Sequence, residues 1–223
     1  MPRVIISDVD ETLVHGNSIK SALIEEYGSD ISDQVEIRIE GFGNSVAYAQ
    51  LIGALAVVRP TTGIGSFVSM ASACYPSILC LVPYALSSND GYAELDIFSS
   101  IPVIVPNGSV EGVTGYGTGL EFVDQTAGGL SAGAGRVCGK LLKIRDALSC
   151  TWWEARYRAQ QTGSNGGAWD KYTGYGEIDA AAAIAYADQI PADPYLPSPL
   201  PDIVARLGAV RVATPDLLVE AVE

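Results

Sequence analysis

The sequence is poor in histidine and in basic residues. His15 is the single histidine among 223 residues, and 13 Lys and Arg stand against 26 Asp and Glu, which leaves a net charge of −13. A metal site built on several histidines is therefore excluded, and any reaction that uses an imidazole as base must use residue 15. Nucleic acid is bound by clustered basic residues that neutralise phosphates, so we expect no nucleic-acid partner.

Long apolar runs are also lacking. No stretch approaches the roughly 18 uninterrupted apolar residues that cross a bilayer, and no apolar run of signal-peptide length precedes residues 4–6. We therefore expect synthesis in the cytoplasm and no membrane partner, while later release by another route stays open. The four cysteines form no C-x-x-C pair, and all but Cys150 lie in apolar runs, which predicts buried thiols.

The segments that are present alternate between strand-like and helix-like patterns. Short apolar or alternating runs predict strands at residues 4–8, 34–40, 56–58, 78–82 and 103–105. Helical spacing of apolar residues predicts helices at residues 15–27, 45–55, 66–73, 134–148 and 178–187. This alternation favours an α/β fold with a mostly parallel sheet.

The C-terminal end differs in composition. Five prolines lie between residues 191 and 201, and an amphipathic tail follows at residues 203–223. Proline can neither continue a helix nor donate to a strand ladder, so an extended segment is expected. We therefore divide the chain into a domain at residues 1–188 and an arm at residues 189–223, which either straps onto the domain or docks a partner.

A serine motif follows the middle of the chain. Residues 129–133 fit the pattern G-x-S-x-G, which places Ser131 in a tight turn before a helix. In α/β-hydrolases the histidine follows the serine, and no histidine follows Ser131. The chymotrypsin order belongs to an all-β protein. The remaining order is Asp, His, Ser, supplied by Asp8 or Asp10, His15 and Ser131, which is the order of subtilisin.

Several further segments resemble those of the subtilisin-like serine proteases, in the family's order. Residues 129–139 resemble the nucleophile segment, although Leu130 replaces its usual threonine and Gly135 its usual proline. "YGTGLEFV" resembles the preceding strand and "HGNSI" the start of the histidine helix. Residues 153–162 and 175–180 resemble the closing segments, and residues 4–8 the strand that carries the aspartate. The resemblance implies a three-layer, doubly wound, subtilisin-like fold.

The same resemblance implies the roles of the site residues. Ser131 is expected to attack a peptide carbonyl, His15 to act as the base, and Asp8 to orient the imidazole. Asn89, or more weakly Asn107, is expected to hold the oxyanion together with the backbone N–H of Ser131.

Substrate binding is implied as well. The segment Thr61, Thr62 and Gly63 is expected to pair with an extended peptide or protein substrate. No cofactor is required. Calcium sites are common in the family, but no cluster of carboxylates here has the spacing of a calcium-binding loop, so no metal is predicted. The sequence makes no prediction of the oligomeric state.

Two other interpretations remain. Residues 8–13 match the D-x-D-x-T signature of haloacid-dehalogenase-like phosphatases, in which Asp8 would accept phosphate, Asp10 would be the acid and base, and Mg²⁺ would bind both. That family also has a later lysine and an acidic pair, for which Asp90 and Asp96 are the nearest match in this sequence. Alternatively, the short Asp8–His15 spacing and the changes at Leu130 and Gly135 indicate a subtilisin-like scaffold that has lost activity.

Overall fold

The structure is a computed structural model. It describes residues 1–8, 12–58, 75–81, 103–104, 106–108, 120–126, 129–170 and 172–195. The chain separates into two compact units, residues 1–191 and residues 192–223. In the second unit the described residues form a short turn, in which the backbone N–H of Tyr195 donates to Asp193 Oδ1 at 2.9 Å. Residues 189–195 of the predicted C-terminal arm are described; the rest of the arm lies outside the described residues, as does the helix predicted at residues 66–73.

A five-stranded parallel sheet forms the centre of the first unit, in the order β2-β1-β3-β4-β5. Its strands are β1 (Val4–Asp8), β2 (Val35–Ile39), β3 (Ala56–Val58), β4 (Leu79–Leu81) and β5 (Val103–Ile104). All residues of β1 and β3 are buried, as expected for parallel strands covered on both faces. The strand order reverses at β1: β2 lies on one side of β1, and β3 and the later strands lie on the other. The carboxyl edge at such a reversal is where open α/β sheets bind ligands.

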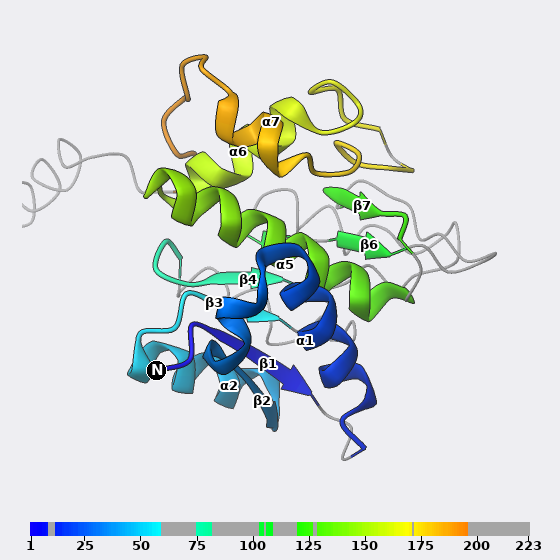
Figure 1. The fold of residues 1–223 in the computed structure, drawn as a ribbon. Coiled ribbons are helices and arrows are strands. Elements are labelled where there is room, and N and C mark those ends of the chain that lie inside the picture. The colour runs from blue at the N-terminus through cyan, green and yellow to red at the C-terminus, as the bar shows by residue number, and fades with distance from the viewer. Residues whose placement is uncertain are drawn as a thin grey trace, which may run out of the picture. The chain divides into compact units, whose positions relative to one another are not determined.

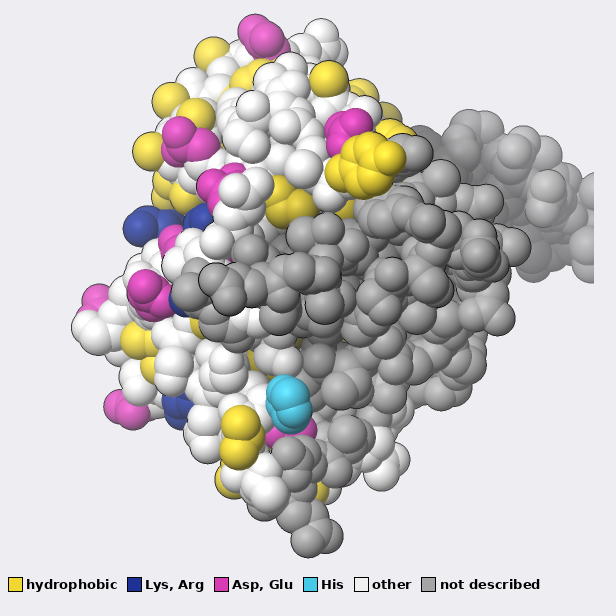
Figure 2. All heavy atoms as spheres, turned by 90° about the vertical axis from the view of Figure 1, so that its right-hand side faces the viewer, with side chains coloured by type: hydrophobic (Ala, Val, Ile, Leu, Met, Phe, Trp, Pro, Cys, Tyr) yellow, Lys and Arg dark blue, Asp and Glu magenta, His cyan; other side chains and the backbone are white. Residues whose placement is uncertain are grey.

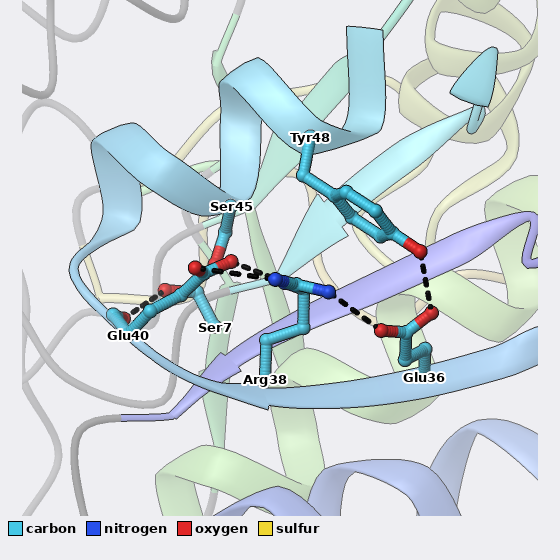
Figure 3. Close-up of polar contacts among 6 residues, drawn as sticks. All are labelled: Ser7, Glu36, Arg38, Glu40, Ser45 and Tyr48. Carbon is cyan, nitrogen blue, oxygen red and sulfur yellow. Dashed lines mark hydrogen bonds and ion pairs between the residues drawn. The ribbon is translucent and has the colours of Figure 1, made fainter. Parts of the chain in front are cut away.

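Helices cover both faces of this sheet. Helices α1 (Val14–Tyr27) and α5 (Gly129–Leu148) lie side by side on one face (Figure 1). Helix α2 (Phe42–Ile52) lies on the opposite face, as Figure 3 shows. The fold is therefore a three-layer α/β structure with a parallel, doubly wound sheet, as predicted.

The remaining elements lie around α5. Helices α6 (Trp152–Thr162) and α7 (Ala180–Ala185) pack against it. Strands β6 (Pro106–Gly108) and β7 (Phe122–Asp124) form a separate parallel pair that also contacts α5. A short 3-10 helix, η1 (Ser29–Gln34), joins α1 to β2. The buried core runs between the sheet and these helices, and it includes the aromatic side chains of Phe122 and Trp152.

Several element boundaries differ from the predicted ones. α5 begins at Gly129, five residues before the predicted start, so Ser131 lies in the first turn of the helix and not in a turn before it. α2 ends at Ile52, because Gly53 adopts a left-handed conformation with φ 69° and closes the helix. α7 is shorter than predicted at both ends. α6 was not predicted; the side chains of Thr151 and Glu154 cap its first turn reciprocally.

No helix among the described residues combines the length and apolar character that a membrane crossing requires.

Candidate active site

Asp8 is the last residue of β1, at the carboxyl edge of the sheet. Its side chain is fully buried, and Oδ2 accepts a hydrogen bond from the backbone N–H of Gly16 at 2.7 Å. Gly16 belongs to the first turn of α1, whose leading N–H groups have no partner within the helix. The Asp8 carboxylate therefore binds the amino-terminal end of the helix that carries His15.

His15 lies in the same first turn of α1 and its side chain is exposed. Figure 2 views the molecule from the side toward which the strands of Figure 1 point, and the histidine lies at the surface there. Leu13, just before the helix, has a left-handed backbone with φ 57°. This sharp entry lets the chain pass from the end of β1 to the start of α1 within a few residues.

Ser131 faces His15 from the first turn of α5. Gly129 begins this helix with φ 77°, a conformation that glycine adopts without strain. The Ser131 hydroxyl is nearly buried, and Oγ lies 3.2 Å from Nδ1 of His15. When the imidazole carries its proton on Nε2, Nδ1 is free to accept from the hydroxyl. The contact predicted between the only histidine and Ser131 is thus present.

The two helices meet through glycines. A β-carbon on Gly135 would overlap the carbonyl oxygen of Ile19, and one on Gly139 would lie 2.8 Å from the carbonyl oxygen of Leu23. His15 and Ser131, Ile19 and Gly135, and Leu23 and Gly139 are all 116 positions apart in sequence.

Steps of four residues correspond to about one helical turn. The contacts at Gly135 and Gly139 therefore place α1 against α5 in parallel and in one register. On the next turn toward the amino termini, that register brings His15 to Ser131.

Charged side chains join the middle of α5 to the last turn of α1 and to β7. Arg136 Nη2 lies 3.1 Å from Glu25 Oε2, and Arg136 Nη1 lies 3.7 Å from Asp124 Oδ1. Lys140 Nζ lies 3.8 Å from Glu26 Oε1 and 3.7 Å from Asp124 Oδ2. Asp124 ends β7 and is buried, and its Oδ1 accepts from the backbone N–H of Thr126 at 2.9 Å. This network ties α1 to the segment that leads to Ser131.

A second polar network closes the carboxyl edge of β1 and β2 (Figure 3). Arg38 pairs with both Glu36 and Glu40, and its guanidinium carbon lies 3.8 Å from the ring centre of Tyr48. The hydrogen bond from Arg38 holds the pKa of Glu40 below its ordinary value, and it is also the main cause that raises the pKa of Arg38. The backbone N–H of Glu40 donates to the carbonyl oxygen of Asp8 at 3.0 Å, which fixes the backbone beneath the site.

Most of the other predicted site residues are not among those that the structure describes. Asp10, Asn89 and the predicted substrate strand Thr61, Thr62 and Gly63 lie outside the described residues. Asn107 lies in β6 opposite Val123 of β7, and not in a turn. Between Asp8 and His15, which are both described, the structure has neither a hydrogen bond nor an ion pair. The described residues hold no cluster of three or more potential metal ligands.

Sequence reasoning missed the glycines that position the site. Gly135 stands where the family usually has proline. The backbone of α1 accounts for this glycine, because the carbonyl oxygen of Ile19 leaves no room for a β-carbon. A signal for it exists in the sequence: Ser131, Gly135 and Gly139 recur at intervals of four, which places small residues along one stripe of a helix. The partner stripe on α1 consists of backbone carbonyls and leaves no trace in the residue types.

Solved structures share this fold at low sequence identity. MycP1 from Mycobacterium smegmatis has a TM-score of 0.54 and 12% identity, over 76% of this chain and 68% of that one. The MycP3 protease of the type VII (ESX-3) secretion system has a TM-score of 0.59 and 12% identity, over 83% of each chain. Fervidolysin from Fervidobacterium pennivorans, a keratinolytic enzyme related to subtilisin, has a TM-score of 0.53 and 15% identity, over 73% of this chain.

The match spans 33% of the fervidolysin chain, so this chain corresponds to about a third of that enzyme's length. No protein-family model and no curated protein matches the sequence. The expectation drawn from the sequence motifs is confirmed at the level of the fold: the chain has the fold of the subtilisin-like proteases.

Proposed function

We propose that this protein is a serine endopeptidase in which Ser131 is the nucleophile and His15 the general base. The observation that carries the proposal is the 3.2 Å contact between Ser131 Oγ and His15 Nδ1, made at the amino-terminal turns of two parallel helices. The order Asp, His, Ser along the chain and a fold shared with solved proteases support it.

The reaction follows from this geometry. Ser131 Oγ attacks the peptide carbonyl carbon as His15 removes the hydroxyl proton, and His15 then returns that proton to the leaving amine. Water deprotonated by His15 hydrolyses the resulting acyl ester and regenerates the serine. The chemistry requires no cofactor.

Negative charge on the carbonyl oxygen develops beside the amino terminus of α5. The first N–H groups of this 20-residue helix point outward, and its dipole favours an anion there. The backbone N–H of Ser131 is one such donor, and Asn89 is the proposed second one. Loss of one oxyanion donor typically lowers kcat by about 10²–10³. Thr61, Thr62 and Gly63 are proposed to bind the substrate as an added strand.

The phosphatase interpretation requires Asp8 to attack a phosphorus atom. Asp8 is fully buried, and its Oδ2 is bonded to the Gly16 amide, which leaves that oxygen poorly placed to meet a phosphate ester. The arrangement therefore favours the protease. A scaffold without activity is distinguished from it by experiment.

A fluorophosphonate probe, which reacts with activated serines, tests the proposal. We expect one label per wild-type molecule by intact mass, and none in Ser131→Ala or His15→Ala. Ser21→Ala is the matched control, because Ser21 is an exposed serine of α1, and it should label like the wild type. A folded wild type that takes no label would support the inactive scaffold. Mg²⁺-dependent hydrolysis of p-nitrophenyl phosphate, lost in Asp8→Asn, would support the phosphatase.

A further inference from the structure

A cavity of about 510 Å³ lies between the last turn of α1, the middle of α5 and the segments that end α6 and begin α7. Its volume falls within the range of about 300–1,000 Å³ that is usual for small-molecule sites. The described residues that line it include neither Ser131 nor His15. We propose that this cavity binds a short peptide by its free amino and carboxyl termini. The inference does not rest on the proposed function.

Two lysines of α5 form the side that receives the carboxyl terminus. Lys140 and Lys143 both line the cavity, and their spacing places them on one face of the helix. The Lys140 ammonium lies 3.7 Å from Asp124 Oδ2 and 3.8 Å from Glu26 Oε1, which is too far for a hydrogen bond. Lys143 Nζ donates one bond, of 3.3 Å, to the carbonyl oxygen of Glu26. Both ammonium groups therefore have N–H donors left for a carboxylate.

The charge of Lys143 is the one that its surroundings leave unbalanced. Arg136 and Lys140 both approach the buried Asp124, and each also pairs with a glutamate at the end of α1. Asp124 Oδ2 has no hydrogen-bond partner in the described part of the chain, so it attracts the Lys140 ammonium without using its N–H groups. Lys143 pairs with no carboxylate of the residues that the structure describes. A ligand carboxylate thus gains a counter-charge from Lys143 and hydrogen-bond donors from Lys140.

Two carboxylates on the segment that begins α7 form the side that receives the amino terminus. Glu177 Oε1 accepts from the backbone N–H of Gln125 at 2.8 Å, and Asp179 Oδ1 accepts from that of Ala182 at 2.9 Å. These bonds hold both side chains in place and leave the second oxygen of each without a donor among the described residues. Neither carboxylate has a counter-ion within the same part of the structure. Glu177 and Asp179 can therefore accept from an ammonium group.

The segment that carries these carboxylates is closely packed. The backbone N–H of Ser164 donates to the carbonyl oxygen of Glu177 at 3.0 Å, and the N–H of Glu177 donates to Ser164 Oγ at 2.9 Å. A β-carbon on Gly163 would overlap the carbonyl oxygen of Tyr175. This wall of the cavity is thus built from backbone that is already tied together, and a preorganised site loses less conformational freedom on binding.

The two sides together determine the class of ligand. A simple anion drawn to Lys143 would also meet Glu177 and Asp179, and a simple cation drawn to these carboxylates would meet Lys143. A peptide with free termini carries both charges at the two ends of one short backbone. It therefore satisfies the lysines and the carboxylates at once.

Calorimetric titration with dialanine tests the proposal, in Ser131→Ala protein so that no peptide is cleaved. We expect saturable binding, and at least about fivefold weaker binding of N-acetyl-dialanine and of dialanine amide, because each has lost one charged terminus. Free alanine should also bind more weakly, since its two charges flank a single carbon while the lysines and the carboxylates belong to separate segments.

Variants locate the binding in this cavity. Lys143→Gln and Glu177→Gln should each weaken dialanine binding by about fivefold or more, and glutamine at 177 can still accept from the Gln125 N–H. Lys20→Gln is the matched control for the lysine, because Lys20 also donates one bond to a backbone carbonyl, that of Val35, and lies outside the cavity. Asp33→Asn is the control for the carboxylate. Both controls should bind dialanine like the parent protein.

A folded protein that shows no saturable binding of dialanine would overturn the proposal. So would a blocked peptide, acetate or methylamine that binds as tightly as dialanine, because one charge would then suffice. Unchanged binding in folded Lys143→Gln and Glu177→Gln would place the peptide elsewhere on the protein and would overturn the assignment of this cavity.

Discussion

The carbonyl oxygen of Ile19 occupies the place where a β-carbon of residue 135 would lie. This contact joins two helix backbones without a side chain between them, and it lies one turn away from the pair His15 and Ser131. Its neighbours on both helices have the same separation in sequence, so a shift at this point changes the distance between the two candidate catalytic side chains.

Replacing Gly135 by alanine should therefore separate α1 from α5. Backbone cannot give way as a flexible side chain does, and overpacking of this kind typically costs about 1–3 kcal/mol. We expect lower stability by chemical denaturation and a loss of fluorophosphonate labelling that exceeds the fraction of unfolded protein. The control is Gly41→Ala, since a β-carbon on Gly41 meets nothing within 4 Å. A Gly135→Ala variant that labels at the wild-type rate would contradict the role of this contact.

Arg156 and Glu121 form a buried pair between α6 and the start of β7. Arg156 Nε lies 2.6 Å from Glu121 Oε1, to which Gln160 also donates at 2.9 Å. Arg156→Met leaves the carboxylate buried without its counter-ion, and breaking such a pair typically costs about 3–5 kcal/mol. Urea unfolding at pH 7 measures this loss. The double variant Glu121→Gln/Arg156→Met should recover part of it, and an additive double variant would show that the pair is uncoupled.

The same pair predicts a pH dependence. Burial raises the pKa of Glu121 above its ordinary value of 4.5, and Arg156 opposes this rise. Without Arg156 the folded protein favours the protonated acid still more, so the penalty grows as the pH rises above 4.5 and is relieved as the pH falls toward it. The free-energy difference between the wild type and Arg156→Met should narrow from pH 7 to pH 5. A difference that stays constant or widens would contradict this sign.

Glu40 should show the opposite dependence. Arg38 lowers its folded pKa, so the pair stabilises the protein above pH 4.5 and this contribution is lost as the pH falls through the lower folded value. Partly exposed pairs of this kind contribute about 0.2–1 kcal/mol. Glu40→Gln should be slightly less stable than the wild type at pH 7, and this difference should shrink as the pH falls below 4.5. Asp33→Asn, which removes an exposed carboxylate from η1, is the control; a Glu40→Gln defect that does not shrink below pH 4.5 would contradict the ion-pair origin.

Thiol chemistry offers a further test of the core. Cys138 is fully buried on α5, and burial raises its pKa to about 12. We expect iodoacetamide at pH 8 to leave Cys138 unmodified in the native protein and to modify it in urea, as mapped by peptide mass spectrometry. The half-buried Cys150 should react sooner. Equal rates at Cys138 in native and unfolded protein would mean that α5 does not shield it.

The strand positions and the pairing of His15 with Ser131 could be predicted from the sequence for physical reasons. Buried parallel strands read as short apolar runs, and β1 and β3 have the predicted bounds. The single histidine left one order of catalytic residues that suits an α/β fold.

The start of α5 could not be predicted, because residues 129–135 contain three glycines, which disfavour a helix in isolation. Packing against α1 supplies the stability that intrinsic propensity lacks. The ion pairs of Arg136 could not be predicted either. Glu25 and Asp124 come from distant segments, and the sequence alone does not tell which charged side chains will pair.

The parallel register of α1 and α5 has a consequence for folding. His15 and Ser131 are 116 residues apart, so they meet only after a large loop of chain has closed and the two helices have docked. Formation of either helix alone brings no nucleophile to a base. The rate at which Ser131 becomes reactive to the probe during refolding would thus measure helix docking. We expect it to be slower than the gain of helical circular dichroism.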